Sequence, residues 1–247
     1  MKQGLKKTVI CVLLCAGLIL GVYFTAGAGP GAAAPTAAPT DVPTVPPETE
    51  PPIPADAIRL EQPGLYRVDG WLYDFAGETE SPVWAFDETG RYTTGDGQLD
   101  AALADALHAS GADALEGDAA LRAAYLYIKN EFHYKVREAD AHTEENGSVD
   151  WINERALRFL SIGGGTCYGY AAAFGLLARC IGFEAHIVAG EVNQFHEAHA
   201  FVVIQENGDD YIYDVEMEDA RPERHDDLDL YRQTNHAIYS YWYEPAW

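Results

Sequence analysis

The chain has 247 residues, of which 39 are acidic and only 16 are Lys or Arg, and this gives a formal charge of −23. Such a balance excludes a general nucleic-acid binder, because affinity for phosphate backbones comes from clustered Lys and Arg. Four Cys in a chain of this length exclude a disulfide scaffold. With 48% apolar residues, the chain has enough core material for one sizeable domain with appendages.

The first 28 residues are typical of a secretory signal peptide or an N-terminal membrane anchor. An apolar run reaches Ala28 and is preceded by three basic residues, Lys2, Lys6 and Lys7. The run is short for a spanning helix of ~20 residues, and Ala26-Gly27-Ala28 suits a signal peptidase, so cleavage and retention both remain open. The Lys residues place everything after the run outside the cytoplasm. We therefore expect an extracytoplasmic protein, secreted or anchored, that meets the membrane through this segment only.

Residues 29–57 have the composition of a linker. Nine of the 13 Pro in the chain fall between Pro30 and Pro54, among Ala and Thr. Such a segment cannot bury a core and favours extended polyproline conformations. It is either a semi-rigid spacer that holds a domain off a surface or a tail left after cleavage. Residues 29–247 together carry 13 basic and 39 acidic residues, so the exterior body is strongly acidic.

Aromatic and polar residues alternate around turn signals within residues 58–96, and this pattern predicts two small β-hairpins. The stretch Trp84–Gly95 resembles one unit of the cell-wall-binding repeats of Gram-positive surface proteins, in which aromatic hairpins end in a Thr-Gly turn. Repeat modules need stacked neighbours to form a binding groove. A single copy therefore favours a structural cap over a wall-binding site.

From residue 97 to residue 247, helical patterns come first and strand-like runs follow. Apolar spacing predicts helices over Leu99–Leu107, Leu121–Phe132, Trp151–Ile162 and about Cys167–Cys180, with Asp118 near the N-cap of the second and Gly182 closing the last. Strands are predicted over Ala185–Val188, Ala198–Ile204 and Tyr211–Val215. This order predicts an α+β domain in which helices pack on an antiparallel sheet.

Cys167 is the strongest candidate nucleophile. It stands in the first turn of a predicted helix, directly after Gly163-Gly164-Gly165-Thr166, where unpaired N–H groups and the helix dipole stabilise a thiolate. The glycines would let a substrate backbone approach, and the Cys167 N–H is available to a developing oxyanion. Cys180 lies about 20 Å further along the same helix, too far for a disulfide with Cys167, and is expected to be a core residue.

A thiol nucleophile also needs a base and an acceptor that orients the base, and neighbouring strands can supply both. His199 lies in the second predicted strand, where alternation puts it on the same face as Phe201 and Val203. Asp214 lies in the third strand. Asn207-Gly208 between the two strands is a strong hairpin signal that sets His199 and Asp214 roughly opposite each other. The pattern predicts a Cys-His-Asp arrangement.

Three sequence blocks resemble the transglutaminase-like superfamily: Gly165–Gly190, which includes Gly165-Thr166-Cys167-Tyr168-Gly169-Tyr170-Ala171, then His199-Ala200-Phe201, and Tyr213-Asp214. The resemblance covers about residues 97–247. It implies a papain-like cysteine-protease fold with Cys167 as nucleophile, His199 as base and acid, and Asp214 as the residue that orients the imidazole. The chain departs from the family's frequent Arg, Trp and Pro at His186, Phe201 and Val215. Candidates for the oxyanion or substrate site are Tyr134, Trp151, Gly165 and Tyr168.

Each of these residues also has a purely structural interpretation. Cys167 could be a small core hydrophobe, His199 a core histidine and Asp214 a hairpin charge, but their joint pattern favours catalysis. A zinc site through His196-Glu197-Ala198-His199 is disfavoured, because the spacing is one short of the helical i, i+4 motif and residues three apart on a strand face opposite ways. We expect no metal and no cofactor.

Taken together, these patterns predict an exported cysteine enzyme that acts on amide bonds of a peptide or protein substrate. A substrate associated with the cell wall is one option. An acyl-enzyme would pass to water or to an amine, and the sequence leaves hydrolysis and transamidation open. The alternative is a non-catalytic surface module that binds peptide or cell-wall polymer in the same cleft.

Overall fold

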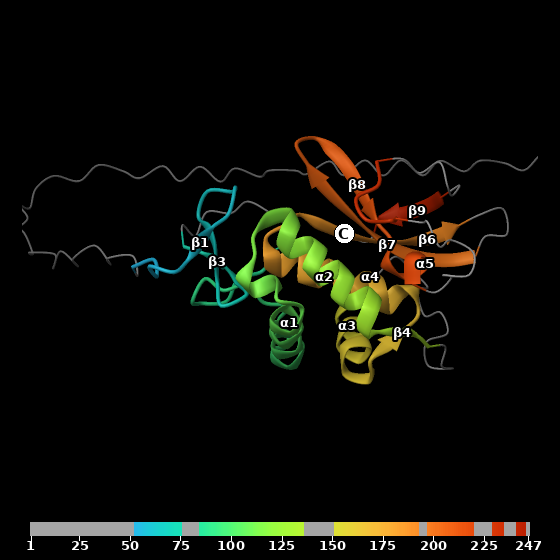
Figure 1. The fold of residues 1–247 in the computed structure, drawn as a ribbon, viewed down its shortest axis with the longest axis horizontal. Coiled ribbons are helices and arrows are strands. Elements are labelled where there is room, and N and C mark those ends of the chain that lie inside the picture. The colour runs from blue at the N-terminus through green and yellow to red at the C-terminus, as the bar shows by residue number, and fades with distance from the viewer. Residues whose placement is uncertain are drawn as a thin grey trace, which may run out of the picture. The chain divides into compact units, whose positions relative to one another are not determined.

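The computed structural model describes residues 52–75, 84–135, 151–192, 197–219, 229–234 and 241–245, which all lie within one compact unit, Glu48–Trp247 (Figure 1). The predicted signal or anchor, residues 1–28, and most of the predicted linker lie outside these residues. Within the described ranges, no helix is both long enough and apolar enough to cross a membrane.

A small antiparallel sheet opens the described part of the chain, in the order β1 (Ile58–Arg59), β2 (Leu65–Val68) and β3 (Trp71–Asp74). The β2–β3 turn consists of Asp69 and Gly70, which both have positive φ, as a tight hairpin requires. In place of a second hairpin of named strands, the Trp84–Gly95 region makes single bridges at Phe86–Tyr92 and Tyr73–Arg91. Buried rings and leucines of this segment belong to the main core: Leu65, Trp71, Leu72, Trp84 and Tyr92. That packing supports the structural cap.

Helices occupy the middle of the chain: α1 (Gly97–Ser110), the 3₁₀ turn η1 (Ala112–Ala114), α2 (Gly117–Glu131), α3 (Trp151–Ile162) and α4 (Cys167–Ile181). The side chain of Asp96 caps α1 by accepting hydrogen bonds from the backbone N–H groups of Gln98 and Leu99. The N-cap of α2 is Glu116, two residues before the predicted cap position at Asp118, which lies inside the first turn. At the end of α4, Gly182 adopts the left-handed conformation, as its position predicted.

The main sheet has the order β8-β7-β6-β9 and is antiparallel throughout. Its strands are β6 (Ala185–Val192), β7 (Glu197–Glu206), β8 (Asp209–Tyr213) and β9 (Tyr241–Pro245). Asn207 and Gly208 both have positive φ and form the predicted β7–β8 turn. The predicted third strand, Tyr211–Val215, starts and ends two residues too late, because β8 ends at Tyr213 and the short helix α5 (Val215–Asp219) begins at Val215.

A short parallel pair joins β4 (His133–Tyr134) to β5 (Gly164–Gly165) just before α4. Gly164 has φ +142°, and a Cβ built on it would lie on top of the carbonyl oxygen of His133. Both glycines of β5 are buried. The glycine loop therefore serves this close backbone pairing, and the approach of a substrate to it stays a prediction.

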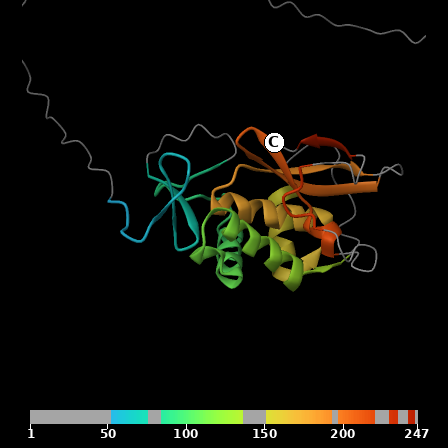
Figure 2. The same cartoon turned by 45° about the horizontal axis from the view of Figure 1, so that its top comes forward.

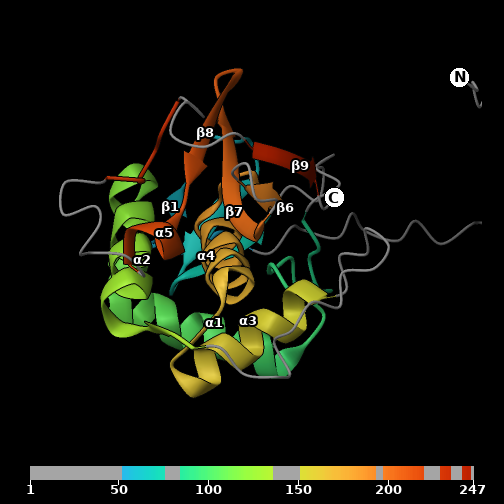
Figure 3. The ribbon, with the colours of Figure 1, turned by 90° about the vertical axis from the view of Figure 1, so that its right-hand side faces the viewer.

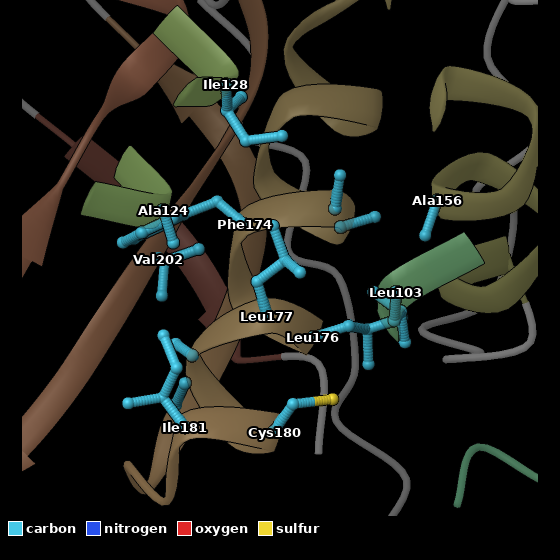
Figure 4. Close-up of a cluster of buried hydrophobic side chains, with 14 of the residues drawn as sticks. Leu103, Ala124, Ile128, Ala156, Phe174, Leu176, Leu177, Cys180, Ile181 and Val202 are labelled. Atoms are coloured by element: carbon cyan, nitrogen blue, oxygen red, sulfur yellow. The ribbon is translucent and has the colours of Figure 1, made fainter. Parts of the chain in front are cut away.

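Helix α4 lies between the sheet and the other helices (Figures 2 and 3). All of its residues except Arg179 are buried. Ala200, Val202 and Ile204 of β7 join the core around α4, of which Figure 4 shows Phe174, Leu177 and Val202. Alternate residues of the sheet form a second cluster on its other face: Val188, Phe201, Val203 and Ile212. The α+β class, with helices packed on an antiparallel sheet, is confirmed.

Candidate active site

Cys167 is the first residue of α4, as predicted. Its N-cap, Thr166, is extended and makes no side-chain capping bond, and the carbonyl of Thr166 accepts from the N–H groups of Gly169 and Tyr170. The N–H groups of the first helical turn thus stand at the positive end of a 15-residue helix. Cys167 is 7% exposed, and its thiol donates to the carbonyl of Ala198 at 4.0 Å. Cys167 therefore lies against the residue that precedes His199.

His199 and Asp214 form a direct, buried pair. Nε2 of His199 lies 2.7 Å from Oδ2 of Asp214, and the two side chains are 5% and 1% exposed. Asp214 is itself held by its surroundings, since Oδ1 accepts from the N–H of Met217 and the backbone carbonyl accepts from the hydroxyl of Tyr125. The structure thus brings together two of the predicted site residues in a hydrogen bond and sets the third beside them.

The route by which Asp214 reaches His199 differs from the predicted one. Because Val202 pairs with Tyr213, continued pairing would set Asp214 opposite Phe201 and not opposite His199. The chain instead leaves the strand after Tyr213 and turns into α5, with the N–H of Asp214 donating to the carbonyl of Leu230. That turn directs the carboxylate back to His199. His199 keeps the predicted face, with its ring stacked near that of Phe201.

Electrostatics favour a charged imidazole at this position. Burial alone lowers the pKa of His199, but the charge of Asp214, its hydrogen bond and a hydrogen bond with Cys167 outweigh burial, so the pKa of His199 lies well above its ordinary value. Because Nε2 faces Asp214, Nδ1 is the nitrogen that can exchange a proton with the thiol of Cys167. This division of the two ring nitrogens suits a general acid and base.

Two further carboxylates stand close to the pair, and the sequence patterns missed both. Oε2 of Glu216 lies 3.7 Å from Nδ1 of His199. Glu218 accepts from the hydroxyl of Tyr125 at 2.6 Å and forms an ion pair with Lys129, which ties α5 to α2. The sequence did contain a signal for them, the acidic spacing Asp214-x-Glu216-x-Glu218. The short helix α5 that follows the strand holds Glu216 and Glu218 in its first turn.

The four candidates for the oxyanion or substrate site occupy different places. Tyr168 follows Cys167 in the first turn of α4 and is buried, with its ring edge-to-face against Trp151 at 5.3 Å. Gly165 is buried in β5, where its carbonyl accepts from the N–H of Lys135. Tyr134 pairs with Gly165 in register and is 45% exposed. Trp151 thus contacts Tyr168, which follows the nucleophile, and Tyr134 pairs with Gly165 of the glycine loop.

His199, Asp214 and Glu216 are the one group of metal-ligating side chains that converges among the described residues, with ligand atoms within 4.8 Å of one another. Three side chains placed in this way could bind one metal cation. However, Nε2 of His199 is engaged by Asp214 at hydrogen-bonding distance, and the ring adjoins a thiol. We therefore interpret the group as acid–base machinery. His196, of the disfavoured zinc motif, lies outside the described residues.

Comparisons with known proteins found a matching family profile and a similar solved structure. A family profile described as the Transglutaminase-like superfamily matches residues 101–245. One similar solved structure, titled "Crystal structure of a TGase", has 15% sequence identity and a TM-score of 0.38, over 47% of this chain and 31% of that chain. This chain thus spans less than a third of the length of that protein. No curated protein matches the chain significantly.

Proposed function

This chain belongs to the transglutaminase-like superfamily, and on that premise we propose that it is a cysteine-based enzyme acting on amide bonds of peptides or proteins. One observation carries the proposal. The buried His199–Asp214 hydrogen bond of 2.7 Å adjoins Cys167 at the positive end of α4. A nucleophile, its base and the acceptor that orients the base are the parts that acyl transfer requires.

The proposed reaction starts from a thiolate at Cys167 and an imidazolium at His199. The sulfur attacks the amide carbonyl, and the oxyanion that forms is stabilised by N–H groups at the start of α4. When the C–N bond breaks, Nδ1–H of His199 protonates the leaving amine, and a thioester to Cys167 remains. Asp214 holds the ring and its Nε2–H throughout.

The second half of the reaction restores the free enzyme. Neutral His199 removes a proton from water or from an amine, which attacks the thioester and releases an acid or a new amide. Both outcomes use the same residues up to the thioester. We propose hydrolysis as the main outcome, because nothing in the sequence marks an amine-acceptor site.

We further propose that this reaction takes place outside the cytoplasm. The proposal rests on the Lys-flanked apolar run in the first 28 residues and on the Pro-rich stretch that follows it. A direct test is to express the full chain in a bacterial host and ask whether extracellular protease shaves the acidic body from intact cells or whether the body is recovered in the medium. Protection until the cells are lysed would contradict export.

The enzymatic proposal is tested by alkylation of the thiol and by capture of the thioester. Wild-type protein is incubated with a library of short peptide amides, and the protein is analysed by mass spectrometry after acid quenching. We expect an acyl adduct on Cys167 with some library members and none in Cys167→Ala. The Cys180→Ala variant is the matched control, because it removes the other described thiol from the same helix and should still form the adduct.

The outcome that would contradict the proposal is equally specific. If Cys167 reacts with iodoacetamide no faster than free cysteine, and no adduct forms, the enzymatic function is wrong. Saturable binding of peptide or cell-wall polymer by the same protein would then favour the non-catalytic surface module.

A further inference from the structure

A second buried carboxylate faces the imidazole of His199. Glu216 lies in the first turn of α5, its side chain is 7% exposed, and its Oε2 is 3.7 Å from Nδ1. Asp214 contacts the other ring nitrogen at 2.7 Å. The ring therefore lies between two acidic groups that are two residues apart in the chain, and only Asp214 belongs to the predicted triad.

The distance separates the roles of the two carboxylates. At 2.7 Å, Asp214 makes a hydrogen bond that fixes the ring. At 3.7 Å, Glu216 is beyond hydrogen-bonding distance but well within the range at which opposite charges shift a titration in a buried site. Glu216 therefore acts on His199 mainly through its charge, and on the nitrogen that exchanges a proton with Cys167.

Among the residues that the structure describes, little competing positive charge lies around His199. On β6, the residue paired with His199 is Gly190, which has no side chain. On α2, the ammonium of Lys129 is paired with Glu218. The titratable groups near the site on the described parts of α4, β8, α5 and α2 are Cys167, Asp214, Glu216, Glu218, Tyr125 and Lys129.

We propose that Glu216 is a positioning residue of this site, whose carboxylate keeps Nδ1 of His199 protonated and so extends to higher pH the range in which Cys167 reacts as a thiolate–imidazolium pair. The inference rests on the proposed function, since it assigns a role to His199 in activating Cys167. It does not require that the substrate be known. The charge of Glu216, more than its shape, is the feature that matters.

The first test is the titration of His199 in the full chain, followed by NMR of the imidazole C–H groups. The chain has eight His, so the His199 signal is assigned by its absence from His199→Gln. In Glu216→Gln we expect the midpoint of His199 to fall by about one pH unit or more, because an opposite charge at this distance shifts a titration by ~1–3 units. Glu88→Gln, which removes an exposed and distant charge, should leave the midpoint unchanged.

The second test reads the same change through Cys167. Negatively charged iodoacetate is favoured over neutral iodoacetamide while the imidazolium is present, so the ratio of the two alkylation rates falls when His199 loses its proton. This fall should occur about one pH unit lower in Glu216→Gln than in the wild type. Glu216→Asp, which keeps the charge on a shorter side chain, should fall between the two and also serves if the Gln variant does not fold.

The two hypotheses fail in different ways. An unchanged His199 midpoint in folded Glu216→Gln, or a Glu216→Asp variant that titrates lower than the Gln variant, overturns the role of Glu216 while Cys167 remains reactive. A wild-type Cys167 that reacts no faster than free cysteine overturns the proposed function instead, and the NMR titration still decides whether Glu216 controls the protonation of His199.

Discussion

The two ends of helix α4 carry the same side chain in opposite circumstances. Cys167 opens the helix, is 7% exposed and adjoins His199, whereas Cys180 lies in the last turn and is completely buried. Burial strongly raises the pKa of the Cys180 thiol, which keeps it protonated and inert. Because both thiols are free, the expected difference in their reactivity comes from the position of each cysteine on the helix and from its neighbours.

Cavity size does not follow this difference in reactivity. A groove of about 560 Å³ lies beside the C-terminal end of α4, and Ile181, Gly182 and Phe183 are among its lining residues. The cavity beside the nucleophile loop, lined by Gly164, Gly165 and neighbours, holds only about 10 Å³, roughly one water. The hydrogen-bond geometry around Cys167 locates the site, and the volume of the larger groove does not.

The largest expected effect comes from replacing each of the two cysteines by alanine. Cys167→Ala should abolish both the rapid alkylation by iodoacetamide at position 167 at neutral pH and any amidase activity, a loss of about 10³-fold or more. Cys180→Ala should retain the alkylation rate and lower the free energy of unfolding by about 1–2 kcal/mol, because it leaves a small cavity in the core. Mass spectrometry of the alkylated protein and urea unfolding measure the two effects.

Two results for Cys167→Ala would contradict the assignment of Cys167 as the reactive thiol and Cys180 as the core residue. A Cys167→Ala protein that is still alkylated rapidly would show that the reactive thiol lies elsewhere, and a large loss of stability on its own would make Cys167 a core residue. Neither outcome is expected for a residue at the start of a helix whose sulfur meets a backbone carbonyl at 4.0 Å.

The next largest effect should come from Asp214→Asn, which keeps the shape of the side chain and removes its charge. The activity should fall by about 10²–10³-fold, because the amide no longer stabilises the imidazolium or fixes its tautomer. The upper pH limit of activity should also fall, since loss of the Asp214 charge lowers the pKa of His199. A rate–pH profile with unchanged upper limit would show that Asp214 does not control His199.

The glycines before and after α4 provide a third contrast. Gly164→Ala would force a Cβ onto the carbonyl oxygen of His133, which is fixed backbone, and should cost about 3 kcal/mol or more and reduce the reactivity of Cys167. Gly182 has φ +110°, and a Cβ added there would meet the tip of the Leu60 side chain, which can move. Gly182→Ala should therefore lower the free energy of unfolding by about 1–2 kcal/mol and leave the reactivity of Cys167 normal. Equal effects of both variants on alkylation would show that β5 does not position the nucleophile.

Features with local sequence causes were predictable. The bounds of α4 follow from the glycines on each side, and the β7–β8 turn follows from Asn207-Gly208, so the positions of Cys167 and His199 could be assigned from the sequence. The same hairpin signal indicated Asp214, and the family resemblance added the residue roles. These signals are short-range, and each depends on fewer than ten residues.

Features with non-local causes were missed. Strand β9 pairs with β6 across about fifty residues, and nothing in its own five residues requires that partner. The pairing of β4 with β5 depends on the contact of Gly164 with His133, which no periodicity shows. Likewise, Glu216 lies near His199 only because the chain turns into a helix after Tyr213, where the sequence predicted that the strand continues.

The smallest effect concerns stability and compares two histidines. Burial lowers the pKa of His199, but Asp214 and Cys167 raise it well above the unfolded value of about 6.5. Its protonation therefore stabilises the fold in full below pH ~6.5, and this contribution is lost as pH rises through the folded-state pKa, at up to about 1.4 kcal/mol per pH unit. Urea unfolding of wild type and His199→Gln between pH 5 and 9 should show a stability difference that shrinks with rising pH.

The matched control is His108, whose pKa is raised by its hydrogen bond with Asp113 at the surface. Because water screens that pair, His108→Gln should leave the pH dependence of unfolding nearly the same as in wild type. If the difference between wild type and His199→Gln is flat with pH, His199 is not held charged by Asp214. A flat result would also remove the electrostatic basis for activating Cys167, because the thiolate at the start of α4 depends on that imidazolium.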